Sequence, residues 1–231
     1  MVTLPESMDV APTLPRPMAI YSADPDAGEI VLVYGTLGNG TRRMSRWTPS
    51  SREPVVLVGP LGQGFTLQDG TRHLLLLGRG IGTCSLVPAA GLAVRRGVSV
   101  TAVDSARSEE ALVVGGAYDE IGATRWAVTD ADGSSDAIIL EKRLIRTFND
   151  TGPEQIAVCG STRLAELARR LGARWGSRVE VSIEAHMACG LGYCHGCSRG
   201  DRTASSETPL VCCDGPTFLL NTRENISGGI K

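Results

Sequence analysis

Residues 73–82 read HLLLLGRGIG, an apolar run followed by glycines at positions 78, 80 and 82. The four leucines from Leu74 to Leu77 are typical of a strand that is buried on both faces, as in a parallel sheet. A helical stretch from about Leu86 to Arg96 follows the glycines, and a second strand from Val98 to Val103 ends on Asp104. The order strand, glycine turn, helix, strand predicts a βαβ unit.

The same pattern continues toward the C-terminus. A third strand is predicted at about Trp126 to Thr129, a helix around Ile138 to Phe148, and a strand from Gln155 to Val158. The next helix is marked by apolar residues at helical spacing, which are Leu164, Leu167, Ala168 and Leu171. Strands that alternate with helices predict a small, mostly parallel α/β domain, to which we assign residues 70–177.

The segments on either side of this domain follow other patterns. From Ala19 to Phe65, short apolar runs at Ile30 to Tyr34 and Val55 to Val58 are separated by turn signals, which predicts antiparallel sheet within residues 1–69. After Gly176, alternation predicts a half-buried strand with Val179, Val181 and Ile183 inside and Glu180, Ser182 and Glu184 outside. The rest of residues 178–231 is rich in loops, so a metal centre would supply the stability that a core does not.

Composition argues against several classes of function. The chain has 231 residues, 42% of them hydrophobic, and its 23 Lys and Arg nearly balance its 25 Asp and Glu. The formal charge of −2 predicts no nucleic-acid partner and no anionic membrane partner. No apolar run approaches the roughly 20 residues that cross a bilayer, and Met1 to Pro15 lacks the pattern of a signal peptide. We therefore expect a cytoplasmic protein, whose seven cysteines stay reduced and serve as metal ligands or buried small residues.

Five of the seven cysteines lie between positions 189 and 213. Four of them, Cys189, Cys194, Cys197 and Cys212, give the spacing C-x4-C-x2-C-x14-C. The first three ligands and a distant fourth form the plant-type arrangement for a [2Fe-2S] cluster. Glycines between the ligands suit a chain that wraps closely around inorganic sulfide, because glycine adopts positive φ without strain. The sequence therefore predicts a small C-terminal [2Fe-2S] domain.

Three alternatives accompany this prediction. A zinc site also takes four cysteines, but it usually pairs them as two C-x2-C units, and only one is present here. Cys213 competes with Cys212 for the place of the fourth ligand on spacing alone. His195 lies inside the loop, but a Rieske-type centre needs two histidines on one iron. We therefore expect His195 to be a solvated loop residue.

Three stretches around the cysteines carry a resemblance to a known family. They are Val179-Glu180-Val181-Ser182-Ile183-Glu184, Met187-Ala188-Cys189-Gly190, and Val211-Cys212-Cys213-Asp214-Gly215-Pro216-Thr217-Phe218. With them, the chain from about Arg16 to Phe218 resembles the iron-sulfur electron-transfer subunit of the two-subunit, NAD-linked dihydroorotate dehydrogenase, in the ferredoxin reductase superfamily. In that family the fourth cluster ligand lies two residues before Asp-Gly-Pro. The resemblance thus implies Cys212 rather than Cys213.

The resemblance implies an FAD site in the N-terminal segment, as part of an antiparallel flavin-binding β-barrel. Arg16-Pro17-Met18-Ala19 is similar to the family's flavin signature Arg-Pro-x-Ser. The family's strand and Gly-Thr turn that hold the FAD diphosphate match Val33-Tyr34-Gly35 and Gly40-Thr41. The chemistry agrees, because a guanidinium bonds phosphate in a bidentate manner and a glycine-rich backbone approaches it closely.

The resemblance also implies a Rossmann-like nucleotide domain that takes NADH as the electron donor. Gly78, Gly80 and Gly82 match the family's glycine-rich turn after the first strand, and Cys159-Gly160 is similar to its Cys-Gly-Pro near the nicotinamide. Asp104, at the end of the second strand, is placed to accept a hydrogen bond from a ribose hydroxyl, which favours NADH over NADPH. Arg107 nearby favours the opposite.

The chain departs from the family pattern at several positions. Only 15 residues precede Arg16, where the family has a substantial stretch of barrel, so we expect a shortened barrel over residues 1–69 whose open edge is completed by a partner or covered in another way. Four residues also differ from the family pattern: Ala19 replaces a hydroxyl residue, Arg79 replaces a glycine, and Ser85 and Ser161 replace prolines. These changes affect the NADH and FAD sites more than the cluster.

The resemblance predicts an electron-transfer subunit of a hetero-oligomer. Electrons would pass from NADH through FAD and the [2Fe-2S] cluster to a catalytic oxidoreductase subunit of the dihydroorotate dehydrogenase kind, with FMN as one candidate for its prosthetic group. No general acid or base is predicted, because the cofactors carry the chemistry; Glu184 is expected near the cluster loop. One alternative is a cluster-bearing docking or single-electron relay subunit with a decayed NAD site. Another is a zinc-stapled regulatory domain without a redox role.

Overall fold

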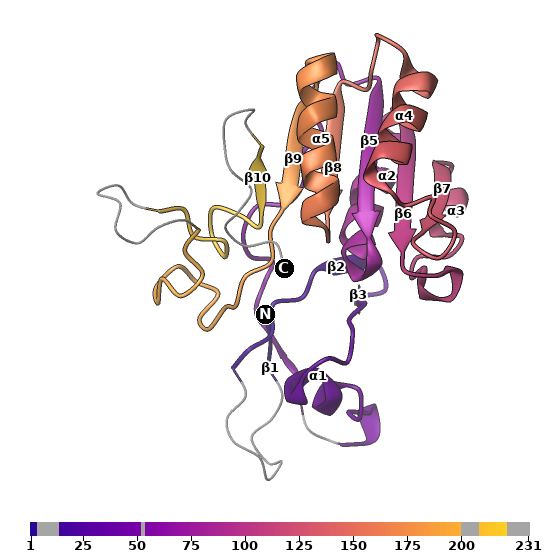
Figure 1. Cartoon of the computed structure of the whole chain (residues 1–231). Coiled ribbons are helices and arrows are strands. Elements are labelled where there is room, and N and C mark those ends of the chain that lie inside the picture. Colours follow the sequence, from indigo (N-terminus) through magenta and orange to yellow (C-terminus); the bar gives the residue numbers. More distant parts are fainter. Residues whose placement is uncertain (4–13, 52–53, 200–207, 221–231) are drawn as a thin grey trace.

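A six-stranded sheet forms the centre of the computed structural model, which describes residues 1–3, 14–51, 54–199 and 208–220. The strand order is β10-β9-β8-β5-β6-β7 (Figure 1). Five strands are parallel: β5 (His73–Arg79), β6 (Ser99–Ala106), β7 (Thr124–Thr129), β8 (Gln155–Cys159) and β9 (Arg178–Ser182). The sixth, β10 (Thr217–Leu219), is antiparallel to β9. The chain runs outward from β5 in both directions, so the topological switch point lies between β5 and β8.

Helices cover both faces of this sheet. One face packs against α2 (Val87–Arg95) and α3 (Ala117–Ile121), and the other against α4 (Ala137–Phe148) and α5 (Thr162–Trp175). Two short 3-10 helices, η2 (Gly80–Leu86) and η3 (Glu109–Ala111), follow β5 and β6. The leucines of β5 alternate between the two cores, because successive side chains of a strand point to opposite faces. The predicted α/β fold is confirmed, and the third strand starts two residues earlier than expected.

The N-terminal segment contains antiparallel strands, as predicted, in two separate pairs. β1 (Val2–Thr3) pairs with β4 (Val56–Leu57), and β2 (Ile20–Asp24) pairs with β3 (Glu29–Leu32). Between β3 and β4 lie α1 (Asn39–Met44) and the 3-10 helix η1 (Pro49–Ser51). Within the described residues these short strands do not close into a barrel, and they leave apolar side chains exposed, including Ile30, Val31 and Val56. The expected barrel is thus represented by two open ribbons.

The C-terminal segment is attached to the edge of the central sheet. β10 pairs with β9 from Thr217 opposite Ser182 to Leu219 opposite Glu180, and the amide of Ile183 donates to the carbonyl of Pro216 at 2.8 Å. Because β9 is parallel to β8, the sheet continues across the boundary expected between residues 177 and 178. No helix in the described part of the chain is long and apolar enough to cross a membrane.

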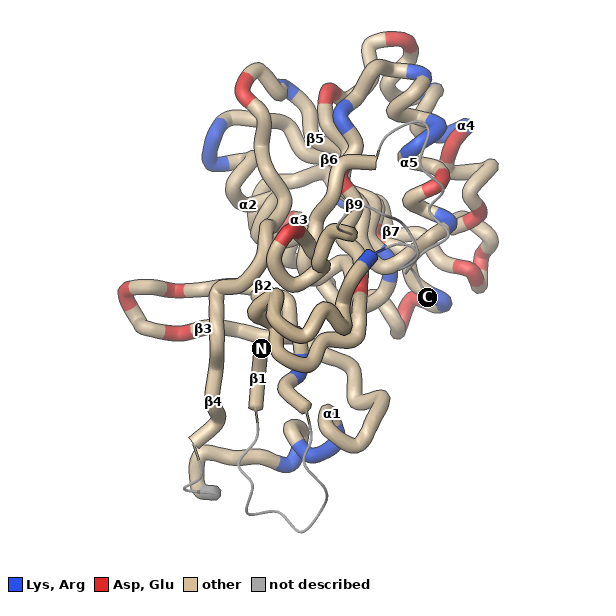
Figure 2. Tube along the Cα trace, turned by 90° about the vertical axis from the view of Figure 1, so that its left-hand side faces the viewer, with Lys and Arg blue, Asp and Glu red and all other residues tan. Residues whose placement is uncertain are grey.

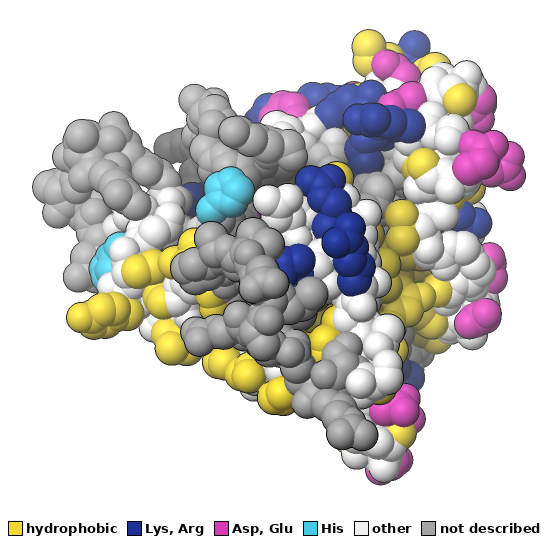
Figure 3. Space-filling model, turned by 90° about the horizontal axis from the view of Figure 1, so that it is seen from below, with side chains coloured by type: hydrophobic (Ala, Val, Ile, Leu, Met, Phe, Trp, Pro, Cys, Tyr) yellow, Lys and Arg dark blue, Asp and Glu magenta, His cyan; other side chains and the backbone are white. Residues whose placement is uncertain are grey.

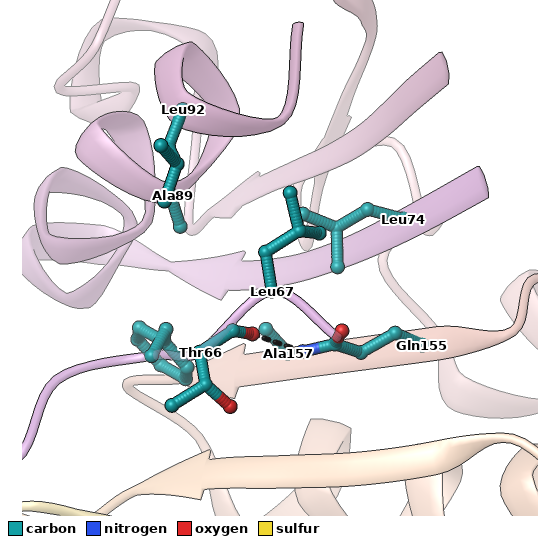
Figure 4. A pocket seen from close by; sticks show the side chains of 8 residues that line it. Thr66, Leu67, Leu74, Ala89, Leu92, Gln155 and Ala157 are labelled. Atoms are coloured by element: carbon teal, nitrogen blue, oxygen red, sulfur yellow. Dashed lines mark hydrogen bonds between the residues drawn. The ribbon is translucent and has the colours of Figure 1, made fainter. Parts of the chain in front are cut away.

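Glu180 on β9 is buried, with 3% of its surface exposed, whereas the alternation of the sequence predicts an outward side chain. Its carboxylate accepts from the amide of Thr66 at 3.0 Å, from the Thr66 hydroxyl at 2.5 Å and from the Arg178 guanidinium at 3.0 Å. Gln155 on β8 donates to the carbonyl of Thr66 beside it (Figure 4). The prediction of exposure was wrong because the connection that precedes β5 covers this face of the sheet.

Removal of the Glu180 carboxylate tests this arrangement. Glu180→Ala leaves the amide of Thr66 without its acceptor, so we expect the free energy of unfolding to fall by about 1–3 kcal/mol. The matched control is Glu120→Ala, at an exposed position of α3, which should change it by less than about 0.5 kcal/mol. Urea unfolding of both variants measures the difference. Equal stability of the two variants would contradict a structural role for Glu180.

Candidate functional site

The loop that follows β9 places Cys189 and Cys194 together. The sulfur of Cys189 accepts from the amides of Leu191 and Cys194, both at 3.4 Å, and the sulfur of Cys194 accepts from the amide of Gly196 at 3.5 Å. Hydrogen bonds from the backbone amides of Cys194 and Leu191 lower the pKa of the Cys189 thiol to about 6. The loop therefore favours the thiolate, which is the form that binds metal.

Cys197 and Cys212 form a second, buried pair. Each is 4% exposed, and both pack with Val211 in a small apolar cluster. Burial raises the pKa of both thiols. Cys213 is exposed, although its sulfur lies 3.7 Å from that of Cys212. Packing thus separates the two adjacent cysteines and favours Cys212 as the partner of Cys197.

Two pairs of thiols suit a cluster with two irons. In a [2Fe-2S] centre with four cysteine ligands, each iron takes two thiolates, whereas one zinc ion would gather all four around a single point. Gly190 and Gly192 have φ of 70° and 78°, so the turns between the ligands require glycine. The donor set fits the predicted cluster better than it fits zinc.

Two of the predicted flavin residues lie in contact. The guanidinium of Arg16 packs on Gly40 in α1, where a Cβ atom would lie 2.5 Å from its nitrogens, so a larger residue at position 40 would displace the guanidinium. The hydroxyl of Thr41 bonds both the amide and the carbonyl of Gly38 at 3.2 Å, which orders the turn. This glycine cradle under a guanidinium fits a diphosphate group. The other predicted flavin residues lie around the hairpin: Pro17, Met18 and Ala19 precede β2, and Val33, Tyr34 and Gly35 follow β3.

Sequence reasoning missed an arginine-lined hollow beside this cradle. Asn39, Arg42, Arg43 and Arg46 surround a cavity of about 230 Å³. Basic side chains gather on the face that Figure 3 shows, and α1 is basic where the β2–β3 hairpin is acidic (Figure 2). The available signal was the run Arg42-Arg43 followed by Arg46.

The predicted nucleotide turn lies at the switch point. A Cβ atom on Gly82 would lie 2.6 Å from the Cα of Gly160, so the turn after β5 touches the turn after β8 backbone to backbone. Gly78 is equally restricted, because its Cβ would lie 2.7 Å from the Thr83 hydroxyl. Cys159 is buried beside these glycines, and Ser85 lies 3.1 Å from its sulfur. The structure thus brings together Gly78, Gly80, Gly82, Cys159 and Gly160 at the edge where dinucleotides bind in such sheets.

Asp104 does not lie at the end of its strand, because β6 continues to Ala106. Its carboxylate is 1% exposed and accepts two hydrogen bonds from Arg125 on β7, at 3.0 and 2.7 Å. A buried carboxylate that is paired in this way has no access to a ribose hydroxyl. The role predicted for Asp104 stays untested, and its placement argues against it.

Comparison with known proteins gives concordant results. Residues 184–222 match the family model for the iron-sulfur cluster binding domain of dihydroorotate dehydrogenase B. The electron transfer subunit of dihydroorotate dehydrogenase B (NAD(+)) from Geobacillus sp. (strain WCH70) is 32% identical over 90% of this chain and 79% of its own length. The subunit of the same name from Shouchella clausii (strain KSM-K16) is 28% identical over 94% and 82%.

A solved structure shows that the fold is shared more widely. An NADH-dependent reduced ferredoxin-NADP oxidoreductase aligns with a TM-score of 0.74 at 23% identity, over 89% of this chain and 72% of that one. The sequence relatives extend along nearly the whole chain, through the glycine turn, the two thiol pairs and the sheet between them. The chain belongs to the family of dihydroorotate dehydrogenase B (NAD(+)) electron transfer subunits.

Proposed function

We propose that this chain passes electrons from NADH through FAD and a [2Fe-2S] cluster to a catalytic partner subunit of the dihydroorotate dehydrogenase kind. The observation that carries the proposal is the arrangement of Cys189, Cys194, Cys197 and Cys212 as two thiol pairs in a segment that matches the family's cluster domain. The partner is a catalytic subunit because the relatives are electron transfer subunits by name. A cytoplasmic location, which keeps the thiols reduced, belongs to the same proposal.

Different residues of this chain would bind the flavin, the nucleotide and the cluster. When bound, FAD accepts a hydride as two electrons and the cluster accepts them one at a time. Arg16 and Gly40 would hold the flavin diphosphate, and Gly78, Gly80 and Gly82 would give the nucleotide close access to the backbone. The amides of Leu191 and Cys194 stabilise negative charge on the Cys189 sulfur. The buried pair Cys197 and Cys212 would shield its iron from water.

The sheet sets the nucleotide turn and the cluster loop side by side. Parallel strands present their carboxyl ends at the same edge, and β5, β8 and β9 are consecutive neighbours. The loop that carries the cysteines therefore starts two strand spacings, about 10 Å, from the turn after β5. The nucleotide turn and the start of the cluster loop therefore lie at the same edge of the sheet, which supports electron transfer within this chain.

A second candidate is a relay subunit that carries the cluster but does not accept electrons from NADH. The burial of Asp104 favours it, because the carboxylate expected to recognise the ribose is engaged by Arg125. The two candidates share the cluster and differ only in the response to NADH.

A visible absorption spectrum of the chain, purified without oxygen, separates these candidates. We expect flavin bands and cluster bands that both bleach when NADH is added, because the electrons pass from the flavin to the cluster. Cluster bands that do not respond to NADH would instead support the relay subunit. A colourless protein would contradict both.

The choice of the fourth ligand has its own test. Cys212→Ser removes a buried thiolate of the second pair, so we expect loss of the cluster absorbance and a lower thermal stability. Cys213→Ser is the matched control, since it removes the adjacent exposed thiol and should retain the cluster. Iron and sulfide analysis of the two purified variants measures the difference, and the reverse result would show that Cys213 is the ligand.

A further inference from the structure

The nucleotide turn carries one charged side chain, Arg79. Arg79 is the last residue of β5, and glycines flank it on both sides. A Cβ atom on Gly78 would meet Thr83 and one on Gly82 would meet Gly160, whereas Gly80 has open space around it but a positive φ of 52°, so a larger residue would be strained at each of these three positions. A side chain at position 79 is tolerated because it points away from the turn, toward the neighbouring strands.

The guanidinium of Arg79 crosses the carboxyl ends of the neighbouring strands. It donates to the hydroxyl of Ser105 on β6 at 3.0 Å, and to both carboxylate oxygens of Asp130, just after β7, at 3.1 and 2.6 Å. Its side chain keeps 22% of its surface exposed. A positive group thus lies along the outer edge of β5, β6 and β7, beside the switch point, where open α/β sheets bind their ligands.

Two guanidiniums share the single carboxylate of Asp130. Arg163, at the start of α5, lies 3.5 Å from the oxygen that also contacts Arg79. Hydrogen bonds from Arg79 and from Ser135 hold the pKa of Asp130 well below its usual range, so this carboxylate stays ionised. Two of these three groups are positive and one is negative, so Asp130 alone does not neutralise both guanidiniums. A guanidinium has five N–H donors on three nitrogens. Arg79 uses only its Nη1 and Nη2 atoms to donate to Ser105 and Asp130.

We propose that Arg79, with Arg163 beside it, binds the diphosphate of the nicotinamide dinucleotide, and that Asp130 holds the two guanidiniums in position for it. The inference rests on the proposed function, because it names residues of this chain that recognise the donor. The ligand class is a nucleoside diphosphate, since a guanidinium fork matches phosphate oxygens. This anchor stands in for the contact that the buried Asp104 does not supply.

The test uses ADP-ribose, which carries the diphosphate without redox chemistry, and adenosine, which lacks phosphate. Titration calorimetry on the full chain with its cofactors measures both. We expect Arg79→Ala to weaken ADP-ribose binding by about tenfold or more, and to change adenosine binding by less than about twofold. The matched control is Arg72→Ala, which removes an ion pair of the same type with Glu154 at the opposite end of β5 and should leave ADP-ribose binding unchanged.

Asp130→Asn separates phosphate binding from a purely structural ion pair. The Asn variant lacks the carboxylate charge that competes with phosphate, but it keeps an oxygen that accepts from the guanidiniums. We therefore expect it to bind ADP-ribose at least as tightly as the wild-type protein does. If the pair were only structural, Asp130→Asn and Arg79→Ala would do equal harm, which would overturn the inference.

Folding is monitored by the cluster absorbance and the melting temperature. Should Arg79→Ala fail to fold, Arg79→Gln removes the charge at nearly constant size and is expected to show the same loss. Wild-type affinity for ADP-ribose in either variant overturns the role of Arg79 and leaves the proposed function standing. Absence of NADH and ADP-ribose binding in the unchanged chain overturns both.

Discussion

The carboxylate of Glu180 connects the three segments of this protein. It lies on β9, accepts from Thr66 in the connection that leaves the N-terminal segment, and sits opposite Leu219 of the strand that closes the cluster segment. An ionised group is stable at such a depth only when hydrogen bonds replace its water, and Thr66, Arg178 and Gln155 provide them. The side chain of Glu180 thus holds the connection from the N-terminal segment, while its backbone pairs with the strand that closes the cluster segment.

The central sheet positions the nucleotide turn and the cluster loop relative to each other. Its switch point lies between β5 and β8, where Gly82 and Gly160 meet backbone to backbone, and β9 is the next strand along. The turn that fits a dinucleotide and the loop that fits a cluster thus emerge at the same edge. The proximity requires no dedicated contact between them, because it follows from parallel pairing. The N-terminal ribbons, which bring Arg16 onto Gly40, lie below this edge in Figure 1.

Much of this organisation was predictable from local patterns. The leucine run with its glycines and the alternation of strands and helices are properties of short stretches, and the structure confirms both. The cysteine spacing is equally local, and the structure brings Cys189 and Cys194 together. The choice of Cys212 came from a family resemblance and is supported by the burial that distinguishes it from Cys213. The arginines around α1 had a visible signal in the sequence that was not used.

The sequence by itself determined the α/β fold and predicted the first three thiol ligands, because periodicity and ligand spacing act over a few residues. Tertiary structure alone decided which charges are buried and what they contact. Glu180 and Asp104 resemble surface residues in the sequence, yet Thr66 and Arg125 reach them from positions 114 and 21 residues away. Arg79 likewise meets Asp130 across 51 residues. Such pairings depend on strand order and on what covers each face of the sheet, which no local pattern encodes.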